Sequence, residues 1–193
     1  MKKLPLLISF LLFGCMVNAQ VLIPKFRSNT TDNPFASIKG YDLLLACRSY
    51  DNVAHTLSFS VLVYKNKHWQ KLAYKEDAKE VPLTVTQPQL KQLPITDAQG
   101  DSLYHQLSDA RIFTIGDDSS LPKCDKSLDV INGTKEMVDH TVEDGPEFRI
   151  WLATPTKTKY LYYYAPESFQ QFCPGNKARQ NVVKIIKMFN TGW

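Results

Sequence analysis

The stretch "TLSFSVLVYKNKHWQKLAY" (Thr56–Tyr74) shows most directly what kind of fold this chain adopts. Its first half alternates apolar and polar residues, which is typical of a β-strand with one buried face. One face carries Leu57, Phe59, Val61 and Val63, and the other carries Ser58 and Ser60. Asn66-Lys67 suits a tight turn, so His68–Tyr74 is predicted to return as the antiparallel partner of a β-hairpin.

Two more strands are predicted beside this hairpin. Tyr41–Arg48 is an apolar run that predicts a preceding strand, after an irregular lead-in over residues 20–40. Val81–Thr86 predicts a weaker strand after the hairpin, and Pro82 places it at an edge because proline cannot donate to the strand ladder. The N-terminal half therefore predicts an antiparallel sheet.

The middle of the chain changes its periodicity. A short helix is predicted from apolar residues at helical spacing, namely Leu103, Leu107 and Ala110. Asp101 or Ser102 is the expected N-cap of this helix. The helix is expected to lead into an apolar strand, Arg111–Ile115, followed by a polar loop, Gly116–Asp129.

The C-terminal third predicts a three-stranded meander. Glu136–Val142 and Glu147–Ala153 are expected to form a hairpin around a turn that contains Gly145. A second turn then leads to Lys159–Ala165, the third strand.

Two helical segments close the chain. Pro166 suits the first position of a helical turn that extends through Phe172, and Asn176 is the expected N-cap of a final helix that ends at Gly192. The final helix has a single apolar stripe, formed by Val182, Ile185, Ile186 and Phe189. These elements predict a single α+β domain over residues 20–193, with antiparallel strands and this amphipathic helix packed on one face.

The N-terminal residues predict an export signal over residues 1–19. Two lysines precede an apolar run of about 14 residues, which is shorter than the roughly 20 that a membrane-spanning helix needs. Two processing routes are open: cleavage after Ala19, or lipidation of Cys15 in the lipobox-like "LFGC". The protein is therefore expected in the periplasm, the cell envelope or the medium of a bacterium, without a transmembrane span.

The charge of the chain argues against a nucleic-acid partner. The full sequence has a formal net charge of +4, and removal of the signal with Lys2 and Lys3 leaves about +2. A basic patch for a phosphate backbone is expected to be far stronger than this.

The cysteines predict one disulfide. Cys124 and Cys173 both lie in polar, proline-containing segments, and in an oxidising compartment they are expected to pair. Cys47 lies in an apolar strand and is expected to be a buried thiol. No cysteine–histidine spacing indicates zinc, and the sequence predicts no cofactor.

No catalytic motif stands out. The chain contains neither G-x-S-x-G nor H-E-x-x-H, and the apolar surroundings of Cys47 oppose a nucleophilic thiolate. His140 alone has acids close by in sequence, Asp139, Glu143 and Asp144. A small secreted hydrolase or metal-dependent enzyme centred on His140 is therefore the alternative hypothesis.

The aromatic stretch "KYLYYYAP" (Lys159–Pro166) carries the leading hypothesis. On a strand, its residues separate into two faces, and the face that excludes Leu161 and Tyr163 is predicted to be a binding surface. That face collects Arg149, Trp151, Tyr160, Tyr162 and Tyr164. Arg, Trp and Tyr are enriched at binding hot spots. We therefore expect a non-enzymatic exported binding module for a protein, peptide or glycan, with ordinary packing of the rings as the competing interpretation.

Overall fold

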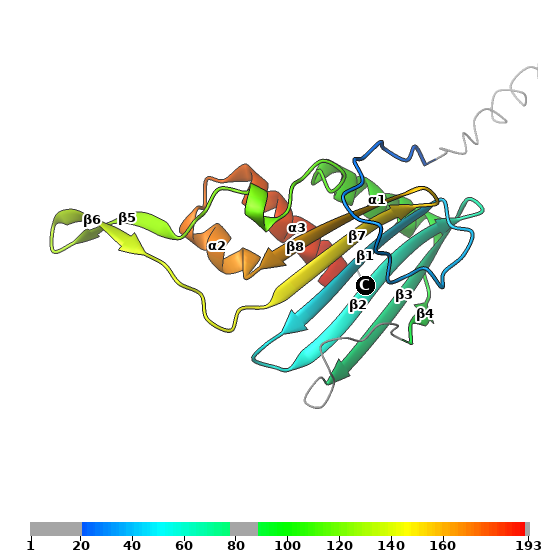
Figure 1. Cartoon of the computed structure of the whole chain (residues 1–193), viewed down its shortest axis with the longest axis horizontal. Coiled ribbons are helices and arrows are strands. Elements are labelled where there is room, and N and C mark those ends of the chain that lie inside the picture. Colours follow the sequence, from blue (N-terminus) through cyan, green and yellow to red (C-terminus); the bar gives the residue numbers. More distant parts are fainter. Residues whose placement is uncertain (1–20, 78–88, 192–193) are drawn as a thin grey trace, which may run out of the picture.

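The computed structural model describes residues 21–77 and 89–191, so the predicted signal, Cys15, the Val81–Thr86 strand and Gly192 lie outside the described residues. The body is a six-stranded antiparallel sheet in the order β4-β3-β2-β1-β7-β8 (Figure 1). Its strands are β1 (Leu43–Asp51), β2 (Thr56–Lys65), β3 (His68–Asp77), β4 (Lys91–Leu93), β7 (Glu147–Thr154) and β8 (Lys157–Tyr164). The predicted α+β class is confirmed, and β2 has the predicted bounds.

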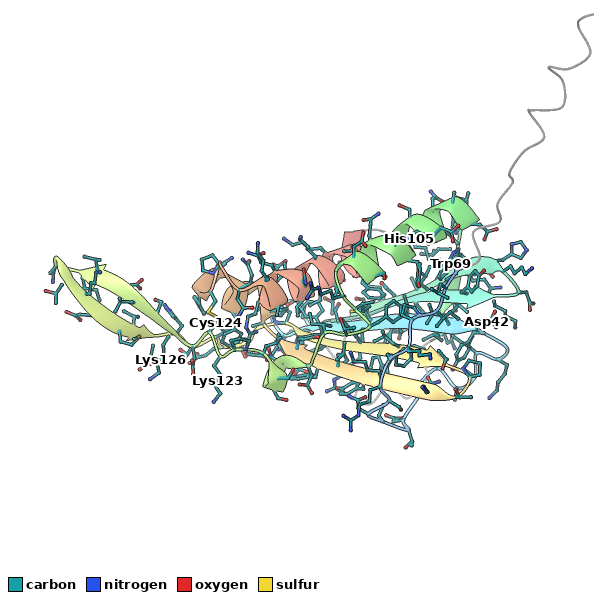
Figure 2. The ribbon with its side chains drawn as sticks, turned by 90° about the horizontal axis from the view of Figure 1, so that it is seen from above. Asp42, Trp69, His105, Lys123, Cys124 and Lys126 are labelled. Atoms are coloured by element: carbon teal, nitrogen blue, oxygen red, sulfur yellow. A yellow bond between two sulfur atoms is a disulfide. The ribbon has the colours of Figure 1, made fainter. Side chains whose placement is uncertain are left out.

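The helices lie on one face of this sheet. They are α1 (Asp97–Asp109), α2 (Pro166–Phe172) and α3 (Lys177–Thr191), and a short 3-10 turn, η1 (Asp118–Ser120), precedes β5. Figure 2 shows α1 and α3 above the sheet. The described N-terminal segment starts on this side, where Phe26 joins the core beneath the helices, and then crosses to the opposite face, where Phe35 is buried. None of the described helices combines the length and the apolar character that crossing a membrane requires.

The final helix packs as its pattern predicts. Asn176 caps it, because its side-chain oxygen accepts a hydrogen bond of 3.1 Å from the backbone N–H of Arg179. The four residues of the apolar stripe are all buried in the core between α3 and the sheet, namely Val182, Ile185, Ile186 and Phe189. Their burial removes apolar surface from water and holds α3 against one sheet face.

The N-cap of α1 differs from the prediction. Thr96 caps the helix, and Gln99 completes a capping box with it. Asp101 and Ser102, the two predicted caps, lie inside the helix, and Asp101 instead accepts a hydrogen bond of 2.7 Å from the indole nitrogen of Trp69. Gly100 lies directly against the Trp69 ring, where a larger residue would clash. The contact between α1 and Trp69 of β3 therefore explains why Asp101 binds the indole nitrogen and does not cap the helix.

The predicted Arg111–Ile115 strand is wrong, because these residues form the exit turn of α1. Arg111 has a φ of 65°, and the backbone N–H of Ile112 donates back to the carbonyl of Leu107. Ile112, Phe113 and Ile115 are nevertheless buried in the core. The apolar residues of Arg111–Ile115 are therefore buried in a turn and not in a strand.

The predicted hairpin between Glu136–Val142 and Glu147–Ala153 is also wrong. Of the first segment, Glu136–Asp139 lies in β6 (Thr134–Asp139), and residues 140–142 lie outside the strand. β6 pairs with β5 (Lys126–Ile131), which begins within the predicted Gly116–Asp129 loop and ends just beyond it. The turn between them is Asn132-Gly133, with positive φ at both residues, which is the strongest two-residue hairpin signal. β7 pairs instead with β1 and β8.

The β5–β6 hairpin projects away from the body as an arm (Figure 1). Its root is tied to the body, since β5 follows Cys124 closely along the chain. Three apolar side chains on one face of the arm are largely exposed, namely Leu128, Val130 and Met137. The described residues of this chain leave that apolar surface open to solvent.

The predicted disulfide between Cys124 and Cys173 is confirmed. It joins the segment after η1 to the end of α2, across a sequence separation of 49 residues. Cys124 is buried at the junction, so the bond fixes the base of the arm against the helical layer.

Removal of this bond provides a test of the fold. The Cys124→Ser/Cys173→Ser variant should lose about 4 kcal/mol of unfolding free energy, because a loop of this length is no longer closed in the unfolded chain. Guanidinium titration of both proteins, followed by circular dichroism, measures the difference. A Cys47→Ser variant that is compared before and after reduction of the disulfide provides the control, and equal stability in both states would contradict the account.

Candidate functional site

The two faces of the six-stranded sheet are covered by different parts of the chain. Leu161 and Tyr163 of β8 lie on the helix-covered face and share its core with Phe148, Ile150 and Leu152, as the alternation predicts. None of the described helices lies on the opposite face (Figure 2). The residues predicted to form a binding surface, Arg149, Trp151, Tyr160, Tyr162 and Tyr164, all belong to this helix-free face.

The strand register arranges this face in rows. One row crosses four strands as Phe59, Arg48, Arg149 and Tyr162. The next row crosses the same strands as Val61, Ala46, Trp151 and Tyr160. Two arginines from β1 and β7 are thus direct cross-strand neighbours, with aromatic rings at both ends of their row.

The segment around Phe35 covers the second of these rows. Phe35 is 1% exposed, and its ring meets Trp151 edge-on with ring centroids 5.7 Å apart. Asn29 runs along β8 and exchanges two hydrogen bonds with the backbone of Tyr160, at 2.7 and 2.8 Å. Trp151 is therefore buried under Phe35, and the Phe35 ring also meets Phe59 of the first row edge-on, with ring centroids 6.2 Å apart.

The three tyrosines of the face have different surroundings. Tyr160 and Tyr162 are half-buried, and burial is the main reason that the pKa of each phenol lies above its usual value. Tyr164 is held by its hydroxyl, which accepts from the N–H of Gly145 and donates to the carbonyl of Val142. Tyr160 and Tyr162 are thus partly open to a ligand, whereas Tyr164 anchors the preceding loop.

Arg48 is the functional candidate that the sequence interpretation missed. It is only 5% exposed, although arginine is rarely buried without a role for its charge. Burial lowers the pKa of its guanidinium, and the neighbouring Arg149 charge lowers it further. Leu44, Ala46 and Arg48 alternate along β1 and therefore share one face of the sheet. This spacing could have predicted that Arg48 lies on the helix-free face.

The acid next to the arginine pair is Glu147. Its carboxylate lies 3.6 Å from the Nη2 atom of Arg149. The Nε atom of Arg149 is buried and has no hydrogen-bond acceptor within the described part of the chain. We call Arg48, Arg149, Tyr160 and Tyr162 the arginine–tyrosine face. Its guanidinium planes and rings can recognise a planar anion through paired hydrogen bonds and stacking.

His140, the centre of the alternative hypothesis, lies at the root of the arm. Its Nε2 atom is 2.7 Å from the Ser127 hydroxyl, and its ring stacks on Phe172 with centroids 4.1 Å apart. No group of three or more metal-ligating side chains occurs within residues 21–77 and 89–191. These contacts explain the position of His140 as a packing element between the arm and α2.

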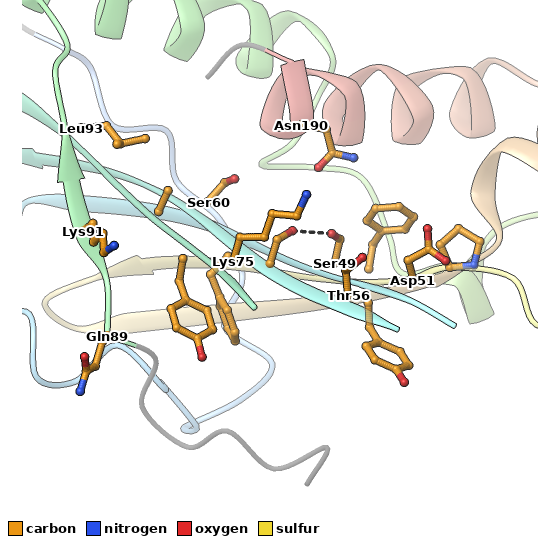
Figure 3. A pocket seen from close by; sticks show the side chains of 16 residues that line it. Ser49, Asp51, Thr56, Ser60, Lys75, Gln89, Lys91, Leu93 and Asn190 are labelled. Atoms are coloured by element: carbon orange, nitrogen blue, oxygen red, sulfur yellow. Dashed lines mark hydrogen bonds between the residues drawn. The ribbon is translucent and has the colours of Figure 1, made fainter. Parts of the chain in front are cut away.

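A cavity of about 750 Å³ lies along β1, β2 and β3, near Asn190 of α3 (Figure 3). Its lining includes Ser49, Ser58 and Ser60, with Lys75 and Asn190 at its border. The hydroxyls of Ser49 and Ser58 already pair with each other at 2.7 Å, and Lys75 is exposed. The cavity offers hydrogen-bonding groups that are partly satisfied, whereas the arginine–tyrosine face places buried charge beside aromatic surface.

The remaining nucleophile candidate, Cys47, is enclosed by the core. Its side chain is 3% exposed, and burial raises the pKa of its thiol strongly. A thiol in this state is protonated at neutral pH and is a poor nucleophile.

Comparison with known proteins found no matching family model, no matching curated protein and no matching solved structure. The function must therefore be inferred from the residues of the site itself.

The cover over Trp151 can be tested by removing Phe35. Phe35→Ala should destabilise the protein by about 3–5 kcal/mol, because it leaves a cavity between Trp151 and Phe59. Urea unfolding followed by circular dichroism measures this loss. The control is Leu22→Ala, which removes a side chain that is 84% exposed and should change stability by less than about 0.5 kcal/mol. Similar small effects in both variants would show that Phe35 does not pack against the sheet.

Proposed function

We propose that the protein is an exported, non-enzymatic binding module that docks a partner protein on its arginine–tyrosine face. The single observation that carries this proposal is the position of Arg48 and Arg149 beside the half-buried Tyr160 and Tyr162, on the sheet face that carries no helix. Tyrosine and arginine bury much area at low entropic cost and dominate binding hot spots.

Export is part of the proposal and has two supports. The pattern of residues 1–19 is that of a secretory signal. The Cys124–Cys173 disulfide is of the kind that persists in an oxidising compartment, such as the periplasm or the medium.

The platform is preorganised for binding. The Trp151 ring packs between Phe35 and Tyr160. Its centroid is 5.4 Å from that of Tyr160, so these contacts hold the Tyr160 ring in place. The backbone of Tyr160 is fixed by Asn29. A partner would therefore meet side chains on a rigid sheet, which lowers the entropic cost of association.

A site-specific cross-link tests the proposal. A photoreactive p-benzoylphenylalanine is placed at Tyr162, or at Lys184 on the exposed side of α3 as the control, in cells that produce the full chain. The Tyr162 position should give one defined cross-linked protein, which mass spectrometry identifies, and the Lys184 position should not give it. Equal cross-linking from both positions, or none from Tyr162, would contradict the proposal.

The identified partner then allows a binding measurement. The Tyr160→Ala/Tyr162→Ala variant should bind the purified partner at least about 30-fold more weakly, as expected for loss of a hot spot of about 2 kcal/mol. Lys184→Ala should bind like the unmodified protein. Unchanged affinity in the double tyrosine variant, with native circular dichroism, would remove this face from the interface.

A further inference from the structure

We infer that the β5–β6 arm is a dimerisation element, in which the apolar face of one arm packs on the same face of the arm of a second copy of this chain. We call Leu128, Val130 and Met137 the arm face. These three side chains are 59%, 67% and 64% exposed. The inference concerns a different surface from the arginine–tyrosine face, so it stands independently of the proposed function.

The arm lacks the support of a wider sheet. Within residues 21–77 and 89–191, β5 and β6 form a two-stranded sheet that is separate from the six-stranded one. A two-stranded hairpin is at best marginally stable in water, and further packing on its apolar face is needed for stability. On the reverse face of the arm, Asp129 lies directly opposite Glu136, and like charges at such positions destabilise a strand pair. A second molecule that covers the arm face would therefore stabilise the hairpin.

The arm face is accessible along its length. Ser127 lies on the reverse face, where its hydroxyl contacts His140, and the His140 ring stacks on Phe172 of α2. The reverse face is therefore the one that is turned toward α2. On the arm-face side, Lys126 and Asp139 form a salt bridge at the root, and their side chains are 59% and 74% exposed. Another arm can thus approach from the tip to the root (Figure 2).

The charges beside the arm face are complementary to themselves. Along β6, Lys135 precedes Met137 by two residues and Asp139 follows it by two, so the three side chains point to the same side. A two-fold axis that crosses the strands at Met137 therefore places Lys135 of each copy opposite Asp139 of the other. Because Leu128 is the cross-strand neighbour of Met137, the same axis packs Leu128 on Leu128 of the second copy. Apolar contact at the centre with ion pairs on both sides is the arrangement of a closed, isologous dimer.

The bodies of the two molecules favour this antiparallel arrangement. A parallel arrangement, with both tips at the same end, would bring the two bodies to the same place at the roots of the arms. The antiparallel arrangement puts the bodies at opposite ends of the paired arms. The reverse face is unsuited to the same contact, because Asp129 and Glu136 of both copies would then meet as like charges.

A charge swap tests the inference in the whole mature protein. Small interfaces associate weakly, so sedimentation velocity is measured from about 10 μM to about 1 mM. The unmodified protein should shift from monomer to dimer over this range. Lys135→Glu and Asp139→Lys should each weaken dimerisation at least about tenfold, because each sets like charges opposite one another. An equimolar mixture of these two variants should dimerise within about threefold of the unmodified protein, since opposite charges then face each other at both contacts.

The matched control for the charge change is Lys184→Glu on the exposed side of α3, which should alter dimerisation less than about twofold. A second test locates the axis. Met137→Cys should form an intermolecular disulfide at least about tenfold faster than Glu136→Cys, because alternation places only residue 137 on the arm face. All of the substituted side chains are exposed, and circular dichroism verifies that each variant is folded.

Four outcomes would overturn the inference. The first is an unmodified protein that stays monomeric throughout the concentration range. The second is equal dimerisation of Lys135→Glu and Lys184→Glu, and the third is a mixture of the two arm variants that dimerises no better than either alone. The fourth is a monomeric protein that binds phosphatidylglycerol vesicles and loses this binding in Leu128→Ser, which would assign the arm face to a lipid surface.

Discussion

The constraint on which the structure depends is that the described helices pack on one face of the six-stranded antiparallel sheet. The apolar stripe of α3 closes that face over Leu161 and Tyr163 of β8. Because side chains alternate along a strand, the same packing sends Tyr160 and Tyr162 to the other face. The position of α3 therefore decides which aromatic residues form the core and which remain available to a partner.

The helix-free face is closed only in part. Phe35 and the segment around it bury Trp151, Arg48 in the adjacent row is 5% exposed, and Tyr160 and Tyr162 stay half-buried. A fully packed second layer would have placed apolar residues at the positions of Arg48 and Arg149, since a buried pair of like charges opposes folding. The structure thus combines a stabilised platform with a local electrostatic cost, a combination that is common where a surface binds a ligand.

Much of the fold could be predicted from the sequence because its signals are local. The alternation over Thr56–Lys65, the start of α2 at Pro166 and the stripe of α3 each depend on residues close together in the chain. The pairing of β7 with β1 joins residues about 100 positions apart in the chain, and no local pattern shows it. Asn132-Gly133 is a local signal for the turn of the arm. The prediction nevertheless placed Gly116–Asp129 in a loop and paired Glu136–Val142 with Glu147–Ala153, so it missed the pairing of β5 with β6.

The candidate site was predictable to a similar degree. The alternation of β7 and β8 was enough to group Arg149, Tyr160 and Tyr162, since it follows from the strands themselves. It could not show that Phe35 covers Trp151, because that contact depends on how an irregular segment crosses the sheet. Arg48 was missed for a related reason, since its partner on β7 is set by long-range register.

The most direct test of the account compares two neighbouring tyrosines of β8. Tyr163 is fully buried under the helices, whereas Tyr162 lies half-buried on the helix-free face. Nitration of the native protein with tetranitromethane, quantified by peptide mass spectrometry, should modify Tyr162 many times faster than Tyr163, and the two rates should become equal in guanidinium. Comparable rates in the native state, or faster modification of Tyr163, would contradict the claim that the helices close one face of the sheet and leave Tyr162 accessible on the other.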